Sequence, residues 1–248
     1  MKLREVELQV PSPEGDIRTA VLSPVNSRSD GGPWPGLLLY TDIFQLTEST
    51  LRTARRLAAQ GFVTYVPEIY PHGELRGVAL EFDDEGKARG LAGAAGTTTA
   101  GFDADRTAVL DHMAENPDVG TLFVTGFCIG GHLAFRAAFD ERVAATVCFY
   151  ATGLQDGKLG ADVADSLQRA GDIRGRLSMV FGSRDPHVPP AARLQIATAL
   201  YDAGHTDAEL HVYAGGEHAF MRDIGPRHDP ALTDLGLAEA VSFFTARS

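Results

Sequence analysis

Cys128 is the strongest candidate for chemistry in the sequence, and it lies in the glycine-rich segment GFCIGG at residues 126–131. An apolar segment runs into this stretch, and a segment with helical spacing follows it. This is the pattern of a nucleophile elbow, G-x-S-x-G, with cysteine in place of serine. Glycine is needed beside the nucleophile because a Cβ there would keep the strand and the helix apart. Since a helix N-terminus favours the thiolate, we predict that Cys128 is a nucleophile rather than an inert, packed cysteine.

A thiol nucleophile needs a base, and the base needs a group that orients it. Asp185 lies in a loop after one apolar segment, and His218 follows another across two glycines. Taken alone, Asp185 could cap a helix and His218 could be a surface residue. The order nucleophile, acid and histidine is, however, that of enzymes built on such an elbow. It predicts a triad of Cys128, His218 and Asp185, with the amide of Ile129 as a donor to an oxyanion.

Three other residues compete for a chemical role. His132 stands four residues after Cys128, but no further ligands with zinc-type spacing accompany the two, so no metal site is predicted. His187 shares the loop of Asp185 and is expected to line the site. Cys148 falls in an apolar segment, as inert buried cysteines do; a redox pair with Cys128 would need Cα atoms within about 7 Å. No phosphate-binding or dinucleotide-binding motif is present, and no cofactor is expected.

Short apolar segments alternate with segments of helical spacing along most of the chain, which predicts βαβ units and a largely parallel sheet. Functional loops collect at the carboxyl ends of such strands. Ahead of them, residues 6–10 and 17–22 are expected to form a strand pair joined by a turn. The buried strands are expected over residues 36–40, 62–66, 121–125, 143–149, 177–181 and 208–213. The helices are expected over residues 47–60, 102–115, 129–139, 191–203 and 230–247.

Two long stretches interrupt this alternation, over residues 68–100 and 151–172. They are candidate lids or site-forming loops, and residues 81–92 within the first could be helical. No internal repeat, low-complexity tract or linker is visible. We therefore expect a single domain over residues 1–248.

Composition narrows the function classes. The 248 residues carry a net charge of −11, with 44% hydrophobic and 22% charged residues. This acidity argues against nucleic acid or an anionic membrane as a partner. No apolar run approaches the roughly 18 residues of a membrane span, and the first ten residues do not resemble a signal peptide. Two cysteines cannot form a disulfide framework, so the expectation is a cytoplasmic globular protein.

The sequence resembles the dienelactone hydrolase family of the α/β-hydrolase fold from about residue 15 to the C-terminus. The resemblance implies a mostly parallel central sheet with helices on both faces. It also implies a Cys-His-Asp triad that acts on lactones or small esters without a cofactor, the amide of Ile43 as a second oxyanion donor, and a monomer or homodimer. The matching segments are Tyr40–Phe44, Gly126–Gly131, Gly182–Pro186 and Gly216–Phe220.

Three positions bear on the substrate that the resemblance implies. Asp42 stands where the family usually has glutamate; it is expected near Cys128, where its charge would disfavour the thiolate, or else bonded to the backbone. His72 stands where a family arginine follows the strand-end tyrosine, and it is expected to offer the substrate a weaker, pH-dependent donor, unless Arg76 reaches the site. Arg222, four residues after His218, is retained. It is expected either to hold a substrate carboxylate or to pair with a neighbour such as Asp223 or Asp42.

Four aromatic residues are expected to line the pocket, with plain core packing as the alternative. They are Phe44, Tyr70, Phe127 and Phe220. The sequence therefore predicts a cysteine-dependent hydrolase whose partner is a small ester or lactone, one that carries an acidic or strongly polar group. The alternatives are a peptidase or acyl transferase on the same fold, and a non-enzymatic thiol-sensing or binding protein.

Overall fold

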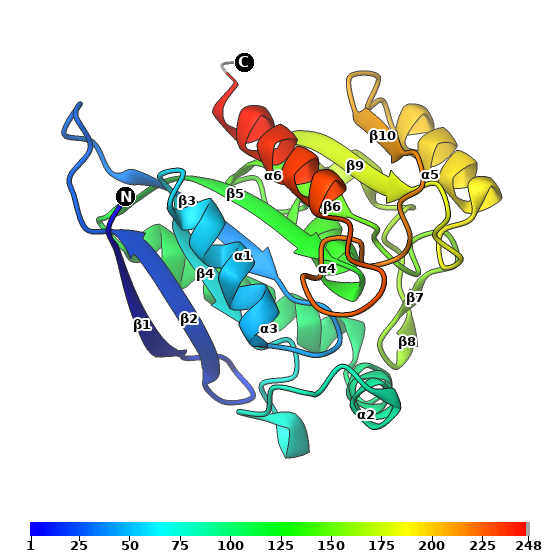
Figure 1. Ribbon diagram of the computed structural model, residues 1–248, viewed down its shortest axis with the longest axis horizontal. Coiled ribbons are helices and arrows are strands. Elements are labelled where there is room, and N and C mark those ends of the chain that lie inside the picture. The colour runs from blue at the N-terminus through cyan, green and yellow to red at the C-terminus, as the bar shows by residue number, and fades with distance from the viewer. Residues whose placement is uncertain (247–248) are drawn as a thin grey trace.

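An eight-stranded sheet runs through the centre of the protein in the computed structural model, which describes residues 1–246 (Figure 1). The strand order is β1-β2-β4-β3-β5-β6-β9-β10. Strand β2 is antiparallel to β1 and to β4, and every other neighbouring pair is parallel. The strands are β1 Leu3–Val10, β2 Ile17–Pro24, β3 Trp34–Tyr40, β4 Val63–Pro67, β5 Val119–Phe127, β6 Val143–Phe149, β9 Arg176–Gly182 and β10 Glu209–Tyr213.

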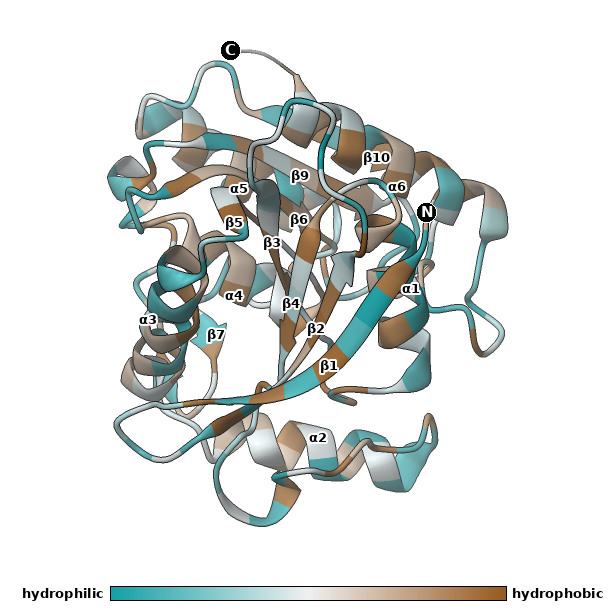
Figure 2. Cartoon of the chain, turned by 90° about the vertical axis from the view of Figure 1, so that its left-hand side faces the viewer, coloured by the Kyte–Doolittle hydropathy of each residue, from teal (hydrophilic) through white to brown (hydrophobic). Residues whose placement is uncertain are grey.

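The burial of each strand follows its sequence pattern. Strand β4 is buried at every position, as are β3, β5, β6 and β9 over most of their length, because both faces of the sheet are covered. Strand β1 at the edge alternates between polar and apolar residues, which Figure 2 shows as alternating colours along the strand. The predicted strand pair and the mostly parallel sheet of an α/β-hydrolase fold are thus confirmed.

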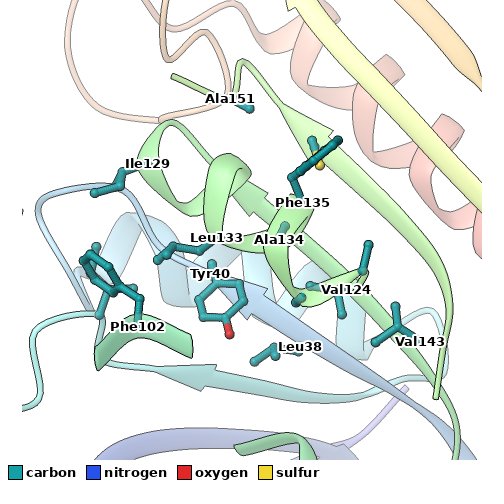
Figure 3. Close-up of a cluster of buried hydrophobic side chains, with 14 of the residues drawn as sticks. Leu38, Tyr40, Phe102, Val124, Ile129, Leu133, Ala134, Phe135, Val143 and Ala151 are labelled. Carbon is teal, nitrogen blue, oxygen red and sulfur yellow. The ribbon is translucent and has the colours of Figure 1, made fainter. Parts of the chain in front are cut away.

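Helices cover both faces of the sheet (Figure 1). The buried residues of α1 and α6 pack into one hydrophobic cluster, and those of α3, α4 and α5 into the other. Figure 3 shows this second cluster, where Leu133 and Ala134 of α4 lie beside Leu38 and Tyr40 of β3. The helices are α1 Glu48–Ala58, α2 Asp84–Ala95, α3 Thr99–Glu115, α4 Ile129–Ala137, α5 Pro190–Asp202 and α6 Pro230–Thr245.

Capping residues explain where the helix boundaries differ from prediction. Helix α3 begins at Thr99, three residues early, because the Thr98 side chain accepts a hydrogen bond from a main-chain amide of the first turn. Thr47 caps α1 in the same way, so that helix begins at Glu48, one residue later than predicted. The last helix ends at Thr245, and residue 247 of the predicted span lies outside the described residues.

The two interrupting stretches contain short elements of their own. Helix α2 lies beyond the carboxyl ends of the strands (Figure 1), three residues later in the chain than predicted. It packs closely through glycines: a Cβ at Gly90 would lie 2.5 Å from the carbonyl oxygen of Ile43, and one at Gly93 3.0 Å from the Tyr70 ring. The remaining short elements are the 3₁₀ helices Gly73–Leu75 and Ala170–Asp172 and the hairpin strands β7 Lys158–Leu159 and β8 Asp162–Val163.

Within residues 1–246, none of the helices is both long enough and apolar enough to cross a bilayer.

We predict that Gly130→Ala destabilises the fold, because a Cβ at this position would lie 2.1 Å from the carbonyl oxygen of Thr41. The free energy of unfolding, measured with urea, should fall by about 1–3 kcal/mol. Gly171→Ala is the matched control, since a Cβ there meets nothing within 4 Å. Equal stability of the two variants would show that the strand and the helix are not tightly pressed together.

Candidate active site

Cys128 occupies the turn between β5 and α4 and has a strained backbone. Its φ is 60° and its ψ is −122°, a conformation that residues with a Cβ rarely adopt. The main chain around it is well satisfied: the Cys128 amide donates to the carbonyl of Phe149 at 3.2 Å, and its own carbonyl accepts from the amides of Gly131 and Thr152 at 3.0 and 3.2 Å. The strained strand–turn–helix geometry predicted for residues 126–131 is therefore present, with Cys128 at a helix N-terminus.

The glycines of the elbow are needed for close packing, as the motif predicts. A Cβ at Gly126 would lie 2.1 Å from the carbonyl oxygen of Gly130, and one at Gly131 2.7 Å from that of Phe149. Gly130 in turn presses against Thr41. The turn after β5 and the loop after β3 are thus in contact, which brings Ile129 and Ile43 into neighbouring segments.

His218 and Asp185 form a direct pair at the carboxyl ends of β9 and β10. Nδ1 of His218 lies 2.8 Å from Oδ2 of Asp185, and both side chains are almost fully buried. The other carboxylate oxygen, Oδ1, accepts from the His187 amide at 2.8 Å. A carboxylate oxygen can only accept, so Nδ1 of His218 carries a proton and Nε2 is the atom left to exchange one with a reactant.

The charges of the three predicted triad residues support one another. Burial opposes a charged imidazole, but the charge of Cys128 and the hydrogen bond with Asp185 outweigh it and raise the pKa of His218 to about 9. Burial likewise opposes a charged Asp185, yet the hydrogen bond from His218 and the charge of that imidazole leave the pKa of Asp185 below its usual value. With its pKa at about 9, the imidazolium is the favoured state of His218 at neutral pH.

Aromatic rings enclose the imidazole of His218. The Tyr150 ring lies 5.2 Å from it and the His187 ring 4.6 Å from it, both edge-on. His187 therefore lines the site, as its loop position suggested. Burial, followed by the charge of His218, lowers the pKa of His187, so the charge on His218 disfavours a second charge on this neighbouring imidazole.

Asp42 and Arg222 are paired with each other at the edge of the site. Oδ2 of Asp42 accepts from Nη2 and Nε of Arg222 at 2.6 and 3.1 Å, while Oδ1 accepts from the amide of Phe44 at 2.9 Å. The guanidinium lies 4.6 Å from the ring centroids of both Phe44 and Phe82. Asp42 thus makes the backbone contact named as its alternative role, and Arg222 pairs with one of the two neighbours anticipated for it.

Of the other three aromatic residues predicted to line the pocket, Phe127 borders a cavity, and Phe220 is a core residue. The Tyr70 side chain is buried, and its hydroxyl has no hydrogen-bond partner within residues 1–246. Phe127 borders a cavity of about 20 Å³ that Asp42 and Arg222 also line. By contrast, Phe220 is fully buried against the rings of Tyr150 and Tyr213 at 5.2 and 5.6 Å, the packing of a core residue.

His72 does not take the place of the family arginine in its contacts. Its Nε2 lies 3.1 Å from Oδ1 of Asp105 on α3, and its Nδ1 lies near Gly15 in the loop between β1 and β2. The expectation that His72 supplies a donor to the substrate is not supported by these contacts, because a carboxylate of the protein already holds its ring.

The two predicted oxyanion donors are amides without a hydrogen-bond acceptor in the described part of the chain. The amide of Ile129 is the first of α4, where no carbonyl of the preceding turn can reach it. The amide of Ile43 also has no partner, although its neighbours Phe44 and Gln45 both donate to Asp42. Two free amides in adjoining turns fit the oxyanion role that we assign below.

Sequence reasoning missed three residues of the site. Thr152 lies with its Oγ1 3.9 Å from the Sγ atom of Cys128, Tyr150 packs on His218, and Phe82 packs on Arg222. The position of Tyr150 and Thr152, just after the carboxyl end of β6, could have identified them. Functional residues collect in the loops that follow parallel strands, and this holds for β6 as it does for β5, β9 and β10.

The competing roles for histidine and cysteine find no support in the geometry. Both ring nitrogens of His132 are held by protein, at 3.0 Å from the carbonyl of Thr152 and 2.7 Å from the hydroxyl of Ser166. Cys148 is buried, and burial raises the pKa of its thiol well above the usual range. No cluster of three or more His, Cys, Asp or Glu that could hold a metal ion occurs among residues 1–246.

Comparisons with known proteins agree with this geometry. The chain is 34% identical over 225 residues to a Saccharomyces cerevisiae protein named "Putative carboxymethylenebutenolidase", covering 88% of this chain and 82% of that protein. A Yersinia pestis protein of the same name is 27% identical over 248 residues, covering 96% and 87%. The fold matches a crystal structure described as a "Putative Dienelactone Hydrolase" from Klebsiella pneumoniae, with a TM-score of 0.82, 22% identity and full coverage of both chains. Because the sequence profile of the Dienelactone hydrolase family matches residues 17–248, the chain belongs to that family.

Proposed function

We propose that this member of the family is a cysteine-dependent hydrolase of lactones and small carboxylic esters that works through an acyl-enzyme on Cys128. One observation carries the proposal: the left-handed elbow at Cys128 stands at the same sheet edge as the buried pair of His218 and Asp185. Such an elbow exposes a nucleophile and aims amide groups at the atom it attacks. The family's hydrolase chemistry supports the same reading.

In the first half-reaction the thiol proton of Cys128 passes to Nε2 of His218, and the thiolate sulfur forms a bond to the carbonyl carbon of the ester. The carbonyl oxygen becomes negative and is stabilised by the amides of Ile129 and Ile43. As the tetrahedral intermediate collapses, the C–O bond to the leaving alcohol breaks and the His218 imidazolium gives its proton to the departing oxygen. A thioester on Cys128 and a free alcohol are the products of this step; from a lactone, the alcohol remains attached to the acyl group.

In the second half-reaction water attacks the thioester. Acylation has removed the negative charge on Cys128 that helps to raise the pKa of His218, so the imidazole, neutral after protonating the alcohol, stays neutral more readily and can act as a base. It takes a proton from water, the C–S bond breaks, and the electron pair returns to the sulfur. Asp185 holds the ring in one tautomer throughout.

We further propose that the substrate carries an acidic or strongly polar group. Two of the five donor hydrogens of Arg222 point to Asp42, and Nη1 has no partner in residues 1–246. The cations Lys87 and Arg227 lie close enough to His187 for their charges to lower its pKa. Asp42 offsets part of this positive charge, so neutral polar esters should also be accepted.

Replacing the proposed nucleophile, Cys128→Ala, should reduce kcat/KM for short esters and lactones by about 10³-fold or more. Alkylation of Cys128 with iodoacetamide, located by peptide mass spectrometry, should abolish activity in parallel. Cys148→Ala is the matched control and should retain activity, because that thiol is fully buried. Labelled enzyme that still hydrolyses esters would exclude Cys128 as the nucleophile, and cleavage of peptides alone would indicate a peptidase.

The pH dependence should report the proton on His218. With its pKa at about 9, the imidazole is charged below this pH, so kcat/KM for an unactivated ester should fall about tenfold per unit above it. Asp185→Asn removes a group that raises this pKa, so the fall should move to lower pH. Asp30→Asn, in a pair with Arg28 before β3, is the control. A fall that does not move in Asp185→Asn would contradict the assigned role.

The role of Arg222 is testable with two esters of equal size, one acidic and one neutral. Arg222→Ala should lower the preference for the acidic ester by about tenfold or more, since a hydrogen bond to a charged group is worth about 1.5–3 kcal/mol. Because this change leaves Asp42 unpaired, the double variant Asp42→Asn with Arg222→Ala is the matched comparison and should show the same loss of preference. Equal losses for both esters would mean that Arg222 only supports the fold.

A further inference from the structure

Thr152 touches the reacting sulfur from outside the proposed triad. It is the third residue after the end of β6, and its Oγ1 lies 3.9 Å from Sγ of Cys128. Its amide donates to the carbonyl of Cys128 at 3.2 Å. The amide bond and the hydroxyl contact, both to Cys128, hold the Thr152 hydroxyl beside the sulfur. The distance between Oγ1 and Sγ is at the long end for a hydrogen bond to sulfur. Catalytic hydrogen bonds are commonly long without substrate and shorten in the reacting complex.

The hydroxyl of Thr152 is available to donate. Among residues 1–246, Oγ1 of Thr152 has no hydrogen-bond partner other than the sulfur of Cys128. By contrast, the hydroxyl of Thr41, in the loop after β3, already donates to a main-chain carbonyl at 3.0 Å. A hydroxyl with a free proton beside a thiolate is the arrangement that a charge-assisted hydrogen bond requires.

A buried chain of hydrogen bonds fixes Thr152 from behind. Its carbonyl oxygen lies 3.0 Å from Nδ1 of His132, and a carbonyl can only accept, so Nδ1 carries the proton. Burial, assisted by the charge of Arg136, lowers the pKa of His132 to about 4, so the ring is neutral near pH 7 and its Nε2 accepts. The hydroxyl of Ser166, 2.7 Å away, is therefore the donor to Nε2.

This series of hydrogen bonds ends at the buried guanidinium of Arg136, which is itself held in place. Nη1 of Arg136 donates to the Ser166 hydroxyl at 3.0 Å, and the guanidinium is paired with Asp103 and Asp165 at 2.6 and 2.9 Å. In this series of hydrogen bonds every donor atom has an acceptor, and the direction of each hydrogen bond follows from that of the preceding one. Such a satisfied, buried network keeps its members in one arrangement, and so keeps Thr152 in contact with Cys128.

We infer that Thr152 is a fourth catalytic residue, whose hydroxyl donates a hydrogen bond to the sulfur of Cys128 whenever that sulfur is negative. This inference rests on the proposed function, in which Cys128 is the nucleophile. The sulfur is negative before it attacks the ester and again when the C–S bond breaks and the electron pair returns to it. At that second moment His218 has taken its proton from water, and Thr152 is the side chain positioned to stabilise the departing thiolate.

The test compares Thr152→Val, which keeps the size of the side chain and removes the hydroxyl, with Thr152→Ser, which keeps the hydroxyl. Thr146→Val is the matched control, because Thr146 lies on β6, the strand that leads to Thr152, is fully buried, and has a hydroxyl without a partner within the described residues. The readouts are kcat for a short ester and the rate of iodoacetamide alkylation of Cys128 against pH. The melting temperature of each variant shows whether it is folded.

Thr152→Val should lower kcat about tenfold and raise the pH of half-maximal alkylation by about one unit, the effects of losing one hydrogen bond to a charged atom. Thr152→Ser should restore both, and Thr146→Val should change neither. If Thr152→Val folds and keeps the alkylation profile and kcat of the wild type, the inference is wrong. If alkylated Cys128 leaves ester hydrolysis intact, the proposed function fails instead, whatever Thr152 does.

Discussion

At Cys128 the main chain adopts a φ of 60°, a conformation that costs an L-residue about 1–3 kcal/mol. The surrounding structure is arranged to hold it. Hydrogen bonds to β6 and to the first turn of α4 satisfy its amide and its carbonyl. Glycines at 126, 130 and 131 let those segments approach to distances that any side chain would prevent. The position of the sulfur is therefore set by the packing of the sheet against α4.

Charge at this site is organised locally, in a protein whose net charge is −11. His218 stands between Cys128 and Asp185, and Arg222 is held by Asp42. Each cation therefore faces an anion of the protein, and each anion has hydrogen bonds that offset its burial. Since the whole chain repels anions at long range, recognition of an acidic substrate would depend on short-range donors such as Nη1 of Arg222.

The sequence allowed the sheet, and the loops that carry the three proposed triad residues, to be predicted because each depends on local pattern. Apolar segments marked the buried strands, and the residues just after them marked the loops that carry Cys128, Asp185 and His218. The contacts of His72 and Phe220 could not be predicted, because they depend on which distant segments pack beside these residues. The ring of His72 contacts Asp105 of α3, and the ring of Phe220 packs against those of Tyr150 and Tyr213. Thr152 was missed for a different reason, since its residue type carries no motif and only its place after β6 relates it to Cys128.

Strain in the main chain points to the same edge of the sheet. Within residues 1–246 the non-glycine residues with positive φ are four: Gln45, Cys128, Tyr150 and Ala219. They follow strands β3, β5, β6 and β10, and Ala219 is the neighbour of His218. Gln45 shows how such a conformation is held, because its buried side chain donates to the carbonyls of residues 75 and 78 and accepts from the amide of Tyr70. Those bonds join the loop that carries Ile43 to the loop that carries Tyr70. Strain confined to these loops is costly for folding, and it persists where the structure around it is fixed well enough to aim reactive groups at one point.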